Sequence, residues 1–221
     1  MTAGPHEIAV ASAREAYAAL PPGAPVRLAK RTSNLFRFRD AGPDAPTALD
    51  LSAFDHVVCV DPAERTAKVG GMTTYEDLAD ATLGHGLMPL VVPQLKTITL
   101  GGAVTGLGIE STALRSGMPH ESVTEMEILT GDGRVVSATD DNEHAALFRG
   151  FPNSYGTLGY ALSLTIELEP VQPFVHMLHL PFSTPEACMD AIAQGATSLN
   201  DPTVRYSSSG ANAIPSMKSA R

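Results

Sequence analysis

The chain has 221 residues, of which 43% are hydrophobic and 18% are charged, and 15 basic against 24 acidic side chains give a net charge of −9. This composition is typical of a globular protein whose hydrophobic core needs no disulfide or metal. The acidic balance, with a pI near 5.1, argues against sequence-independent binding of nucleic acid, which requires clustered Lys and Arg.

No metal site, secretory signal or membrane span is predicted. Cys59 and Cys188 are far apart and lie in no cluster with ligand spacing, so both are expected to be buried as small hydrophobic residues. The N-terminus lacks a basic start with an apolar core. The longest uncharged stretches, 81–95 and 170–185, are shorter than the roughly 18 to 20 residues of a membrane helix. A cytoplasmic protein is therefore expected.

Hydrophobic spacing predicts many short elements in the first half of the chain. A helix over 8–20 ends at Pro21-Pro22-Gly23. Thr73 and Glu76 form a T-x-x-E capping box, which predicts that Thr73 begins a helix that packs on a sheet. The predicted strands are short apolar runs bounded by turn residues, at 26–29, 57–60 and 66–69.

The second half predicts a hairpin at 123–138 that turns at Gly131-Asp132-Gly133, followed by a short helix at 143–148. In the clearest strand, hydrophobic residues alternate with polar ones, so the hydrophobic set is expected to share one buried face. This set is Leu162, Leu164, Ile166 and Leu168.

The pattern changes after residue 170. A strand at 174–180 and a helix at 185–199 are predicted, and the Ser-rich residues from 201 onward are expected to lack regular structure. The loss of apolar spacing after Pro202 predicts a truncated chain or a change of reading frame. Exposed apolar side chains and self-association are expected near Phe174, Val175 and Met177.

The segment from Thr97 to Ser111 is rich in glycine. Glycine lets main-chain N–H groups approach a ligand, so a loop here could bind phosphate in place of basic side chains. No Lys-Ser or Lys-Thr follows, which argues against a P-loop NTPase. A glycine-rich crossover between packed elements explains the pattern equally well. Four of the glycines are Gly101, Gly102, Gly106 and Gly108.

Several motifs occur in a fixed order, and the resemblance they carry spans about residues 8–200. They are Arg31-Thr32-Ser33-Asn34, Gly70-Gly71-Met72-Thr73, Thr99-Leu100-Gly101-Gly102, Gly131-Asp132-Gly133 and Gly156-Thr157-Leu158-Gly159. This series resembles the FAD-binding domain of the vanillyl-alcohol oxidase and p-cresol methylhydroxylase (PCMH-type) flavoproteins. Within that family it is most similar to the Delta(24)-sterol reductase (diminuto-like) branch.

The resemblance implies an α+β fold. A two-subdomain PCMH-type FAD-binding domain is expected at 1–170, with subdomains at about 1–55 and 56–170 and FAD between them. The start of an α+β substrate (cap) domain is expected at 171–200, followed by a disordered tail at 201–221.

The resemblance also implies where FAD binds. The loop from Arg31 to Leu35 would surround the pyrophosphate. The Gly-rich segment from Thr99 to Ser111 would line the pyrophosphate and the flavin. Many relatives have His-Ser where this chain has Ser33-Asn34-Leu35, and that His can bond to the flavin, so non-covalent FAD is expected here. The implied cofactor-binding residues are Arg31, Thr32, Ser33, Asn34, Leu35, Thr99, Leu100, Gly101, Gly102, Gly106, Gly108, Ile109, Glu110, Ser111, Gly156, Gly159 and Ile166.

Arg115 and His120 are candidate catalytic residues. A flavin enzyme needs positive charge or a donor near flavin N1 and a group that moves the substrate proton. Both residues also have ordinary explanations, because Arg115 could form a salt bridge and His120 could be a turn residue.

Three functions remain open from the sequence. The first is an FAD-dependent oxidoreductase that passes a hydride between flavin N5 and a small hydrophobic substrate, such as a sterol. The second is a truncated flavin-binding remnant without turnover, and the third is a structural module without a cofactor.

Overall fold

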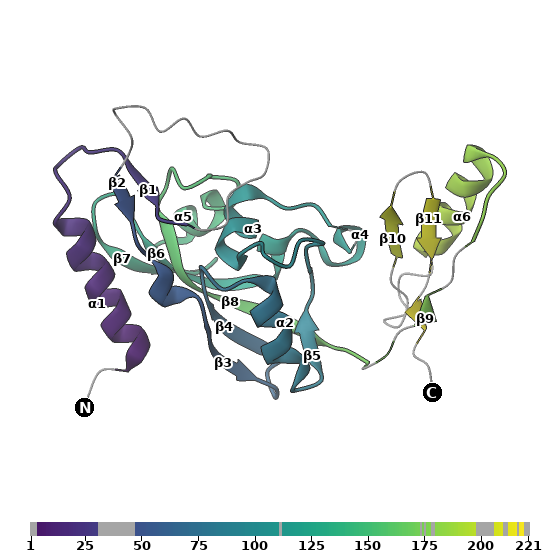
Figure 1. Ribbon diagram of the computed structural model, residues 1–221, viewed down its shortest axis with the longest axis horizontal. Helices are drawn as coiled ribbons and strands as arrows, with labels where there is room; N and C mark the ends of the chain where they lie inside the picture. The colour runs from purple at the N-terminus through teal and green to yellow at the C-terminus, as the bar shows by residue number, and fades with distance from the viewer. Residues whose placement is uncertain are drawn as a thin grey trace.

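A computed structural model describes residues 4–30, 47–110, 112–172, 174, 176–177, 180–197, 206–209, 212–215 and 217–218. Its centre is a six-stranded antiparallel sheet with strand order β3-β4-β8-β6-β7, and β5 pairs with the end of β8 (Figure 1). The expected α+β fold is confirmed.

The elements are short, as the sequence predicts. The sheet contains β3 (Val57–Asp61), β4 (Thr66–Gly70), β5 (Leu87–Pro89), β6 (Val123–Leu129), β7 (Val135–Ala138) and β8 (Tyr160–Pro170). A separate parallel pair is formed by β1 (Val26–Leu28) and β2 (Thr47–Leu49). The helices of this part are α1 (Pro5–Ala18), η1 (Ser52–Phe54), α2 (Tyr75–Leu83), α3 (Leu100–Gly106), α4 (Ala113–Ser116), η2 (Pro119–Ser122) and α5 (Ala145–Gly150).

A bulge in β8 divides its hydrophobic side chains between two faces of the sheet. Glu127 pairs with Ser163, but the next residue of β6, Ile128, pairs with Ala161, so Leu162 has no opposite partner. Such an extra residue reverses the alternation of side chains. The prediction that Leu162 shares a face with the hydrophobic residues that follow it is therefore wrong.

Two hydrophobic clusters result, one on each face. The first cluster lies beneath α2 and α3 and contains Leu164 and Ile166, whereas the second cluster contains Leu162 and the buried residues of α1, β2 and η1. Consecutive β6 residues Ile128 and Leu129 likewise belong to different clusters. The sheet thus has two buried faces, which fits two packing units around one sheet. The boundary near residue 55 stays a prediction.

A polar network fastens α1 to the sheet. The Oε2 atom of Glu127 lies 2.6 Å from His6 Nε2 and accepts a 3.0 Å hydrogen bond from the Ser163 hydroxyl. Farther along the helix, the Tyr17 hydroxyl donates to the Gly131 carbonyl at 2.7 Å. Ser163 is 1% exposed, so the position predicted to face water is buried through a hydrogen bond.

The cap of α2 is shifted by one residue from the prediction. Thr74 is the N-cap, and its hydroxyl oxygen accepts a bond from the Asp77 N–H. Thr73 is fully buried, and its N–H donates to Gly70. Glu76 is left free of the capping box and pairs with Lys96. The turn at Gly70 and Gly71 draws Thr73 inward, so the following threonine begins the helix.

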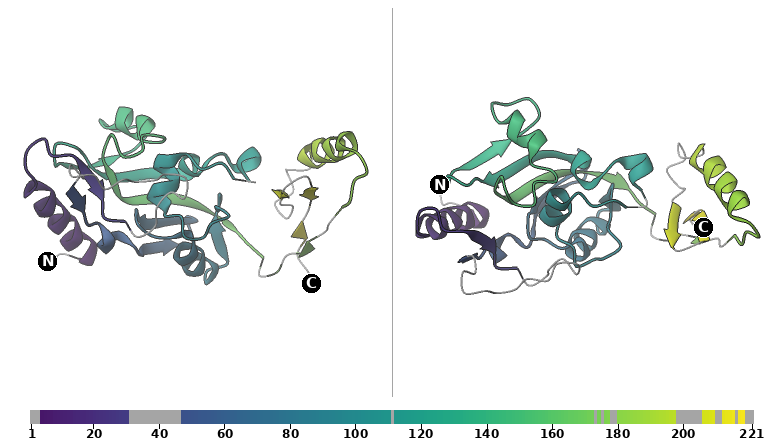
Figure 2. Two further views of the ribbon diagram at one scale, coloured as in Figure 1. Left: turned by 45° about the horizontal axis from the view of Figure 1, so that its top comes forward. Right: turned by 90° about the horizontal axis from the view of Figure 1, so that it is seen from above.

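The C-terminal region lies beyond the end of β8, apart from the six-stranded sheet in each view (Figures 1 and 2). Within the predicted strand at 174–180 the structure describes β9 (His176–Met177), which pairs with β12 (Met217–Lys218), and α6 spans Pro185–Thr197. Contrary to the prediction of a structureless tail, β10 (Tyr206–Ser209) and β11 (Asn212–Pro215) form a hairpin. Main-chain hydrogen bonds build a hairpin, so a polar composition does not prevent one.

Several surface features bear on the other predictions. Cys59 is exposed and Cys188 partly exposed, so the prediction that both are buried is wrong; Cys59 lies beside a bulge in the edge strand β3. Phe174 is 68% exposed, as predicted, and self-association stays a prediction.

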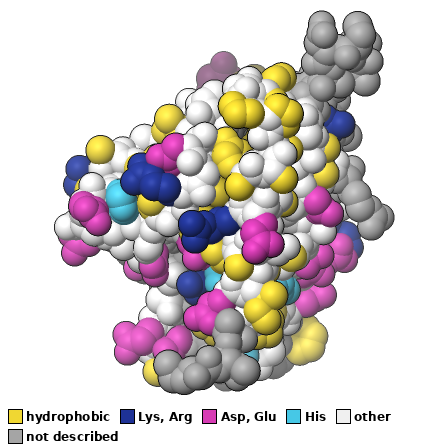
Figure 3. Space-filling view, turned by 90° about the vertical axis from the view of Figure 1, so that its left-hand side faces the viewer, with side chains coloured by type: hydrophobic (Ala, Val, Ile, Leu, Met, Phe, Trp, Pro, Cys, Tyr) yellow, Lys and Arg dark blue, Asp and Glu magenta, His cyan; other side chains and the backbone are white. Residues whose placement is uncertain are grey.

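Acidic and basic side chains are interspersed on the face seen in Figure 3. Among the described residues, no helix is long and apolar enough to cross a membrane.

Gly159 is expected to be intolerant of any side chain. Its φ is +133°, and a Cβ there would overlap the carbonyl oxygen of Leu129. Gly159→Ala should therefore lower the free energy of unfolding by about 2 kcal/mol or more, measured by urea denaturation. The control is Gly131→Ala, where a Cβ meets nothing within 4 Å, and a change of less than about 0.5 kcal/mol is expected. Equal stability of the two variants would contradict this assignment.

Candidate functional site

The Gly-rich segment begins with a helix, α3, where a loop was predicted. Thr99 is the N-cap, and its hydroxyl oxygen accepts a 3.2 Å bond from the Gly102 N–H. Leu100, Ala103 and Val104 are buried in the first cluster. These positions have the i, i+3, i+4 spacing of one helix face, so packing on the sheet outweighs the low helix propensity of glycine.

Two glycines let α3 approach the sheet closely. The Gly101 N–H donates to the Gly71 carbonyl at 3.0 Å. A Cβ on Gly101 would lie 2.7 Å from that carbonyl oxygen, and a Cβ on Gly71 would overlap the carbonyl of Ala161 in β8. Three main-chain segments are therefore stacked without intervening side chains, which is the crossover that the sequence left open as an alternative.

The first N–H groups of α3 are bonded within the protein. Leu100 N–H donates to the Thr73 carbonyl at 2.9 Å, Gly101 N–H to Gly71, and Gly102 N–H to the Thr99 hydroxyl. The expectation that main-chain N–H groups here replace basic side chains as phosphate donors is therefore wrong for these three groups. These N–H groups are already hydrogen-bonded within the stacked backbone.

A lysine reaches this point from the end of β1. Lys30 Nζ donates to the Thr99 hydroxyl oxygen at 2.7 Å. A Cβ on Gly102 would lie 3.1 Å from Lys30 Nζ and 2.9 Å from Thr99 Oγ1. The predicted pyrophosphate loop begins at Arg31, so the sequence analysis missed Lys30. A cation directly before that loop could have been recognised from the sequence as a candidate phosphate ligand. The predicted ligands Arg31, Thr32, Ser33, Asn34, Leu35 and Ser111 lie outside the described residues.

The opposite end of α3 is capped by a distant segment. Asn153 and Tyr155 donate main-chain N–H bonds to the carbonyls of Val104 and Thr105. The Tyr155 hydroxyl donates to the Gly106 carbonyl at 3.4 Å. Carbonyls that a helix end leaves without partners are thus satisfied. Of the predicted cofactor residues, Gly106 accepts the bond from Tyr155, and Gly156 follows Tyr155 in the chain.

Backbone strain is concentrated at this end of α3. Leu107, Asn153 and Tyr155 have φ values of 53°, 59° and 51°. Side chains disfavour this left-handed region by roughly 1 to 2 kcal/mol each. Strained residues of this kind gather at binding and catalytic sites, where the surrounding structure holds them in place.

The other predicted cofactor residues fall into different environments. Gly159 is fixed by its contact with Leu129, and the Ile166 side chain is 1% exposed within the first cluster. The side chain of Ile166 therefore cannot face a ligand, and a cofactor contact there would involve its main chain. Ile109 is 75% exposed. Gly108 follows the strained Leu107.

Glu110 is half-buried beside α2. One carboxylate oxygen accepts a 3.3 Å bond from the Gln94 N–H. Burial raises the pKa of Glu110, while the bond from Gln94 acts in the opposite direction. Burial and then the charge of Glu110 raise the pKa of the Tyr75 hydroxyl. A carboxylate that is costly to bury could accept hydrogen bonds from a ligand hydroxyl.

Among the described residues, four buried polar atoms without hydrogen-bond partners lie on segments that precede, follow or contact α3. They are Thr73 Oγ1, Thr112 Oγ1, His120 Nδ1 and Ser154 Oγ. Each such group costs roughly 1 to 3 kcal/mol when it is left unsatisfied, and its presence calls for a ligand or an ordered water. These segments therefore contain polar atoms that bond to no other residue in the part of the chain that the structure describes.

The two catalytic candidates differ. Both Nη atoms of Arg115 bind the Glu169 carboxylate, at 2.9 and 2.8 Å, so Arg115 forms the salt bridge that the sequence left open as its alternative. His120 lies in the turn η2, which contacts α3, and its Nδ1 is among the unpartnered atoms. A catalytic role for His120 stays a prediction.

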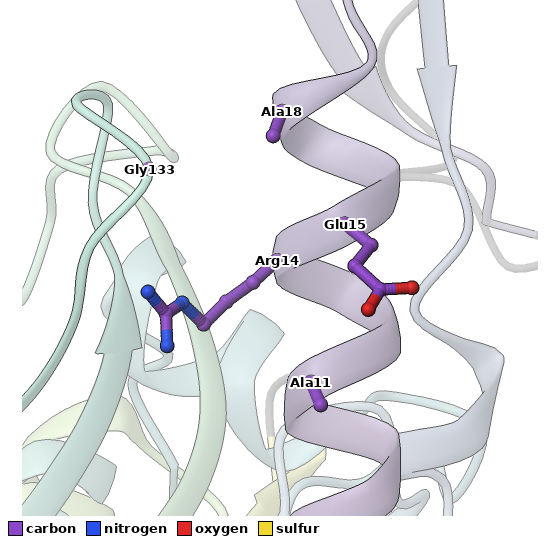
Figure 4. Close-up of a pocket in the computed structure, with 5 residues that line it drawn as sticks. All are labelled: Ala11, Arg14, Glu15, Ala18 and Gly133. Carbon is purple, nitrogen blue, oxygen red and sulfur yellow. The ribbon is translucent and has the colours of Figure 1, made fainter.

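A hollow on the α1 side of the molecule is separate from this region. It is lined by Ala11, Arg14, Glu15, Ala18 and Gly133. Figure 4 shows Arg14 extending toward the β6–β7 turn and Glu15 pointing to the other side of the helix. None of the predicted site residues lines it. Among the described residues, no group of three His, Cys, Asp or Glu side chains is arranged to hold a metal ion.

Comparison with known proteins supports a flavin site. Residues 9–139 match the sequence profile of the FAD binding domain family. The chain is 32% identical over 60% of its length to Delta(24)-sterol reductase of Pisum sativum, covering 24% of that protein. It is 34% identical over 59% of its length to alditol oxidase of a Streptomyces species, covering 30%. It is 30% identical over 57% of its length to cytokinin dehydrogenase 5 of Arabidopsis thaliana, covering 23%. The chain thus spans about a quarter of the length of these relatives.

The region around α3 fits FAD. A diphosphate needs a cation and hydroxyl donors, which Lys30 and Thr99 provide beside Gly102, where a side chain would displace one or both of them. The unpartnered hydroxyls of Thr73, Thr112 and Ser154 can bond to further polar groups of a ligand. The residues present therefore suit a phosphate-containing cofactor with several hydroxyls.

Substitutions at the two adjacent glycines are expected to have different effects. Gly101→Ala forces a Cβ onto the Gly71 carbonyl, so it should lower the melting temperature strongly. Gly102→Val meets the ends of the Lys30 and Thr99 side chains, which can rotate away, so the fold should persist while FAD binding is lost. Circular dichroism melts and FAD retention measure the two effects. A folded Gly102→Val protein that retains FAD would contradict this assignment.

Arg115 is expected to act mainly through stability. Its side chain and that of Glu169 are 21% and 14% exposed, and removing one partner of a buried ion pair leaves the other charge uncompensated. Arg115→Met should therefore cost about 2 kcal/mol or more in urea unfolding. The matched control is Arg149→Met, which breaks the exposed pair with Asp140 and should cost less than about 1 kcal/mol. Similar losses in both variants would argue against a structural ion pair at Arg115.

Proposed function

Because the chain belongs to the FAD binding domain family, which its match over more than half of its length shows, we propose that it forms the cofactor-binding part of an FAD-dependent oxidoreductase. The observation that carries this proposal is the match itself. The contact of Lys30 with the start of α3 supports it, as do the unpartnered hydroxyls on the segments around the helix.

FAD, when bound, supplies the redox chemistry by exchanging a hydride with the substrate at flavin N5. The chain's own residues have other tasks. Lys30 and Thr99 offer a cation and a hydroxyl for the phosphates. The Glu110 carboxylate, whose pKa burial raises, is an acceptor for a cofactor hydroxyl. The Tyr155 hydroxyl and the strained backbone at Leu107 hold the far end of α3 in a fixed shape.

The proposed substrate is a small hydrophobic molecule. Ile109, Tyr155 and Leu158 are 75%, 54% and 41% exposed, and all three belong to the segments at the C-terminal end of α3. Exposed apolar side chains on these segments favour contact with an apolar ligand. The names of the sterol reductases among the relatives make sterols the first class to examine.

FAD should be bound without a covalent bond. Purified protein is expected to be yellow, and heat denaturation should release FAD that chromatography identifies. FMN in the supernatant, or no flavin after reconstitution with excess FAD, would refute the cofactor assignment. Flavin that stays with the denatured chain would refute only the non-covalent attachment.

Turnover is tested by anaerobic bleaching of the flavin. Dithionite should bleach it in every case, which shows that the bound flavin is redox-active. A panel of sterols, primary alcohols, alditols and amines is then tested in both directions: a hydride donor should bleach the oxidised flavin, and an unsaturated sterol that accepts a hydride should restore the colour of flavin reduced with one equivalent of dithionite. Reduction by dithionite, with neither bleaching nor recolouring by any organic compound, would favour the alternative that the chain binds flavin without turnover.

A further inference from the structure

We propose that Lys30 is a phosphate ligand of the bound FAD and supplies the positive charge at the first turn of α3. The inference rests on the proposed FAD binding and extends it to a residue outside every motif that the sequence singled out. Lys30 Nζ donates to the Thr99 hydroxyl at 2.7 Å. The two residues are 69 positions apart, so this one contact joins the end of β1 to the start of α3.

The first three main-chain N–H groups of α3 do not provide charge compensation for a phosphate. The N–H groups of Leu100, Gly101 and Gly102 already donate to Thr73, Gly71 and Thr99. The protein has a net charge of −9, so an approaching diphosphate is repelled at long range unless a local cation attracts it. A lysine ammonium binds phosphate as a compact charge with three N–H donors.

Gly102 preserves the space over this ammonium. A Cβ at position 102 would lie 3.1 Å from Lys30 Nζ, which is too close for the two groups to keep their positions. The glycine therefore leaves the ammonium and the Thr99 hydroxyl side by side at the helix surface. Gly102 itself is only partly buried, so a ligand can reach the place where its side chain would be.

The competing explanation is that Lys30 merely ties β1 to α3 through Thr99. A structural tie would affect stability, and it would weaken the binding of charged and uncharged ligands alike. A phosphate ligand instead makes FAD affinity depend on salt, because an ion contact is screened. The salt dependence of binding therefore separates the two explanations without any activity measurement.

The test compares FAD dissociation constants, from quenching of flavin fluorescence, across a range of salt concentrations. Lys30→Met should weaken FAD binding about tenfold or more at low salt, as expected for loss of a hydrogen bond to a charged group. The slope of log Kd against log salt should also fall. Lys30→Arg keeps the charge and should retain most of the affinity. Circular dichroism establishes that each variant is folded.

Lys68→Met is the matched control. It causes the same change in net charge, but Lys68 lies between Ala67 and Val69 of β4, which both belong to the first cluster. Its side chain therefore points to the sheet face opposite α3. Affinity and salt slope should match those of the wild type. Wild-type affinity and slope in Lys30→Met would overturn the proposal.

A second measurement uses the unmodified protein. Lysines are acetylated with acetic anhydride with and without FAD, and the extent at each lysine is read by mass spectrometry. FAD should protect Lys30 but not Lys96, whose side chain is 69% exposed. Equal modification of Lys30 in both samples would overturn the proposal. If the wild type binds no FAD at all, the proposed function fails first, which distinguishes the two failures.

Discussion

The position of Gly71 between two other main-chain segments is the constraint on which the candidate site depends. Its N–H donates to Leu162 at 2.9 Å, and its carbonyl accepts from Gly101 at 3.0 Å. No Cβ fits at Gly71 or Gly101 without meeting a carbonyl group. Because the bulge in β8 turns the Leu162 side chain into the second cluster, the backbone of β8 is open to this approach.

Because of this stacking, the glycine motif has a structural role at the start of α3. A run of glycines at a phosphate site usually donates main-chain N–H groups to the phosphate, but here the first N–H groups bond within the protein and attach α3 to the sheet. The helix is held by main-chain bonds at both ends, through Gly71 and Thr73 at its start and through Asn153 and Tyr155 at its end. Glycine allows the packing, and the cation beside the first turn of α3 is the side chain of Lys30.

Local patterns predicted the elements well where one signal determines one structure. The turn at Gly131-Asp132-Gly133 and the long strand β8 are present as predicted. The failures occur where tertiary contacts compete with local rules. Alternation could not reveal the bulge at Leu162, and the capping pattern could not show that the turn at Gly71 buries Thr73. The resemblance predicted a cofactor site at the Gly-rich segment, which stays a prediction. The contact between Lys30 and Thr99 could not be predicted, because it depends on how β1 and α3 pack in space.

The two ends of α3 differ in chemistry, and this difference limits what can lie along the helix. The first turn presents the Lys30 ammonium and the Thr99 hydroxyl, whereas the last turn is bordered by the exposed Ile109 and Tyr155. Seven residues at about 1.5 Å of rise per residue separate these ends by roughly 10 Å. A ligand that contacts both must combine an anionic group with a flatter, less polar one at that separation. A flavin attached to a diphosphate meets this requirement, and an isolated phosphate or an apolar molecule alone meets only half of it.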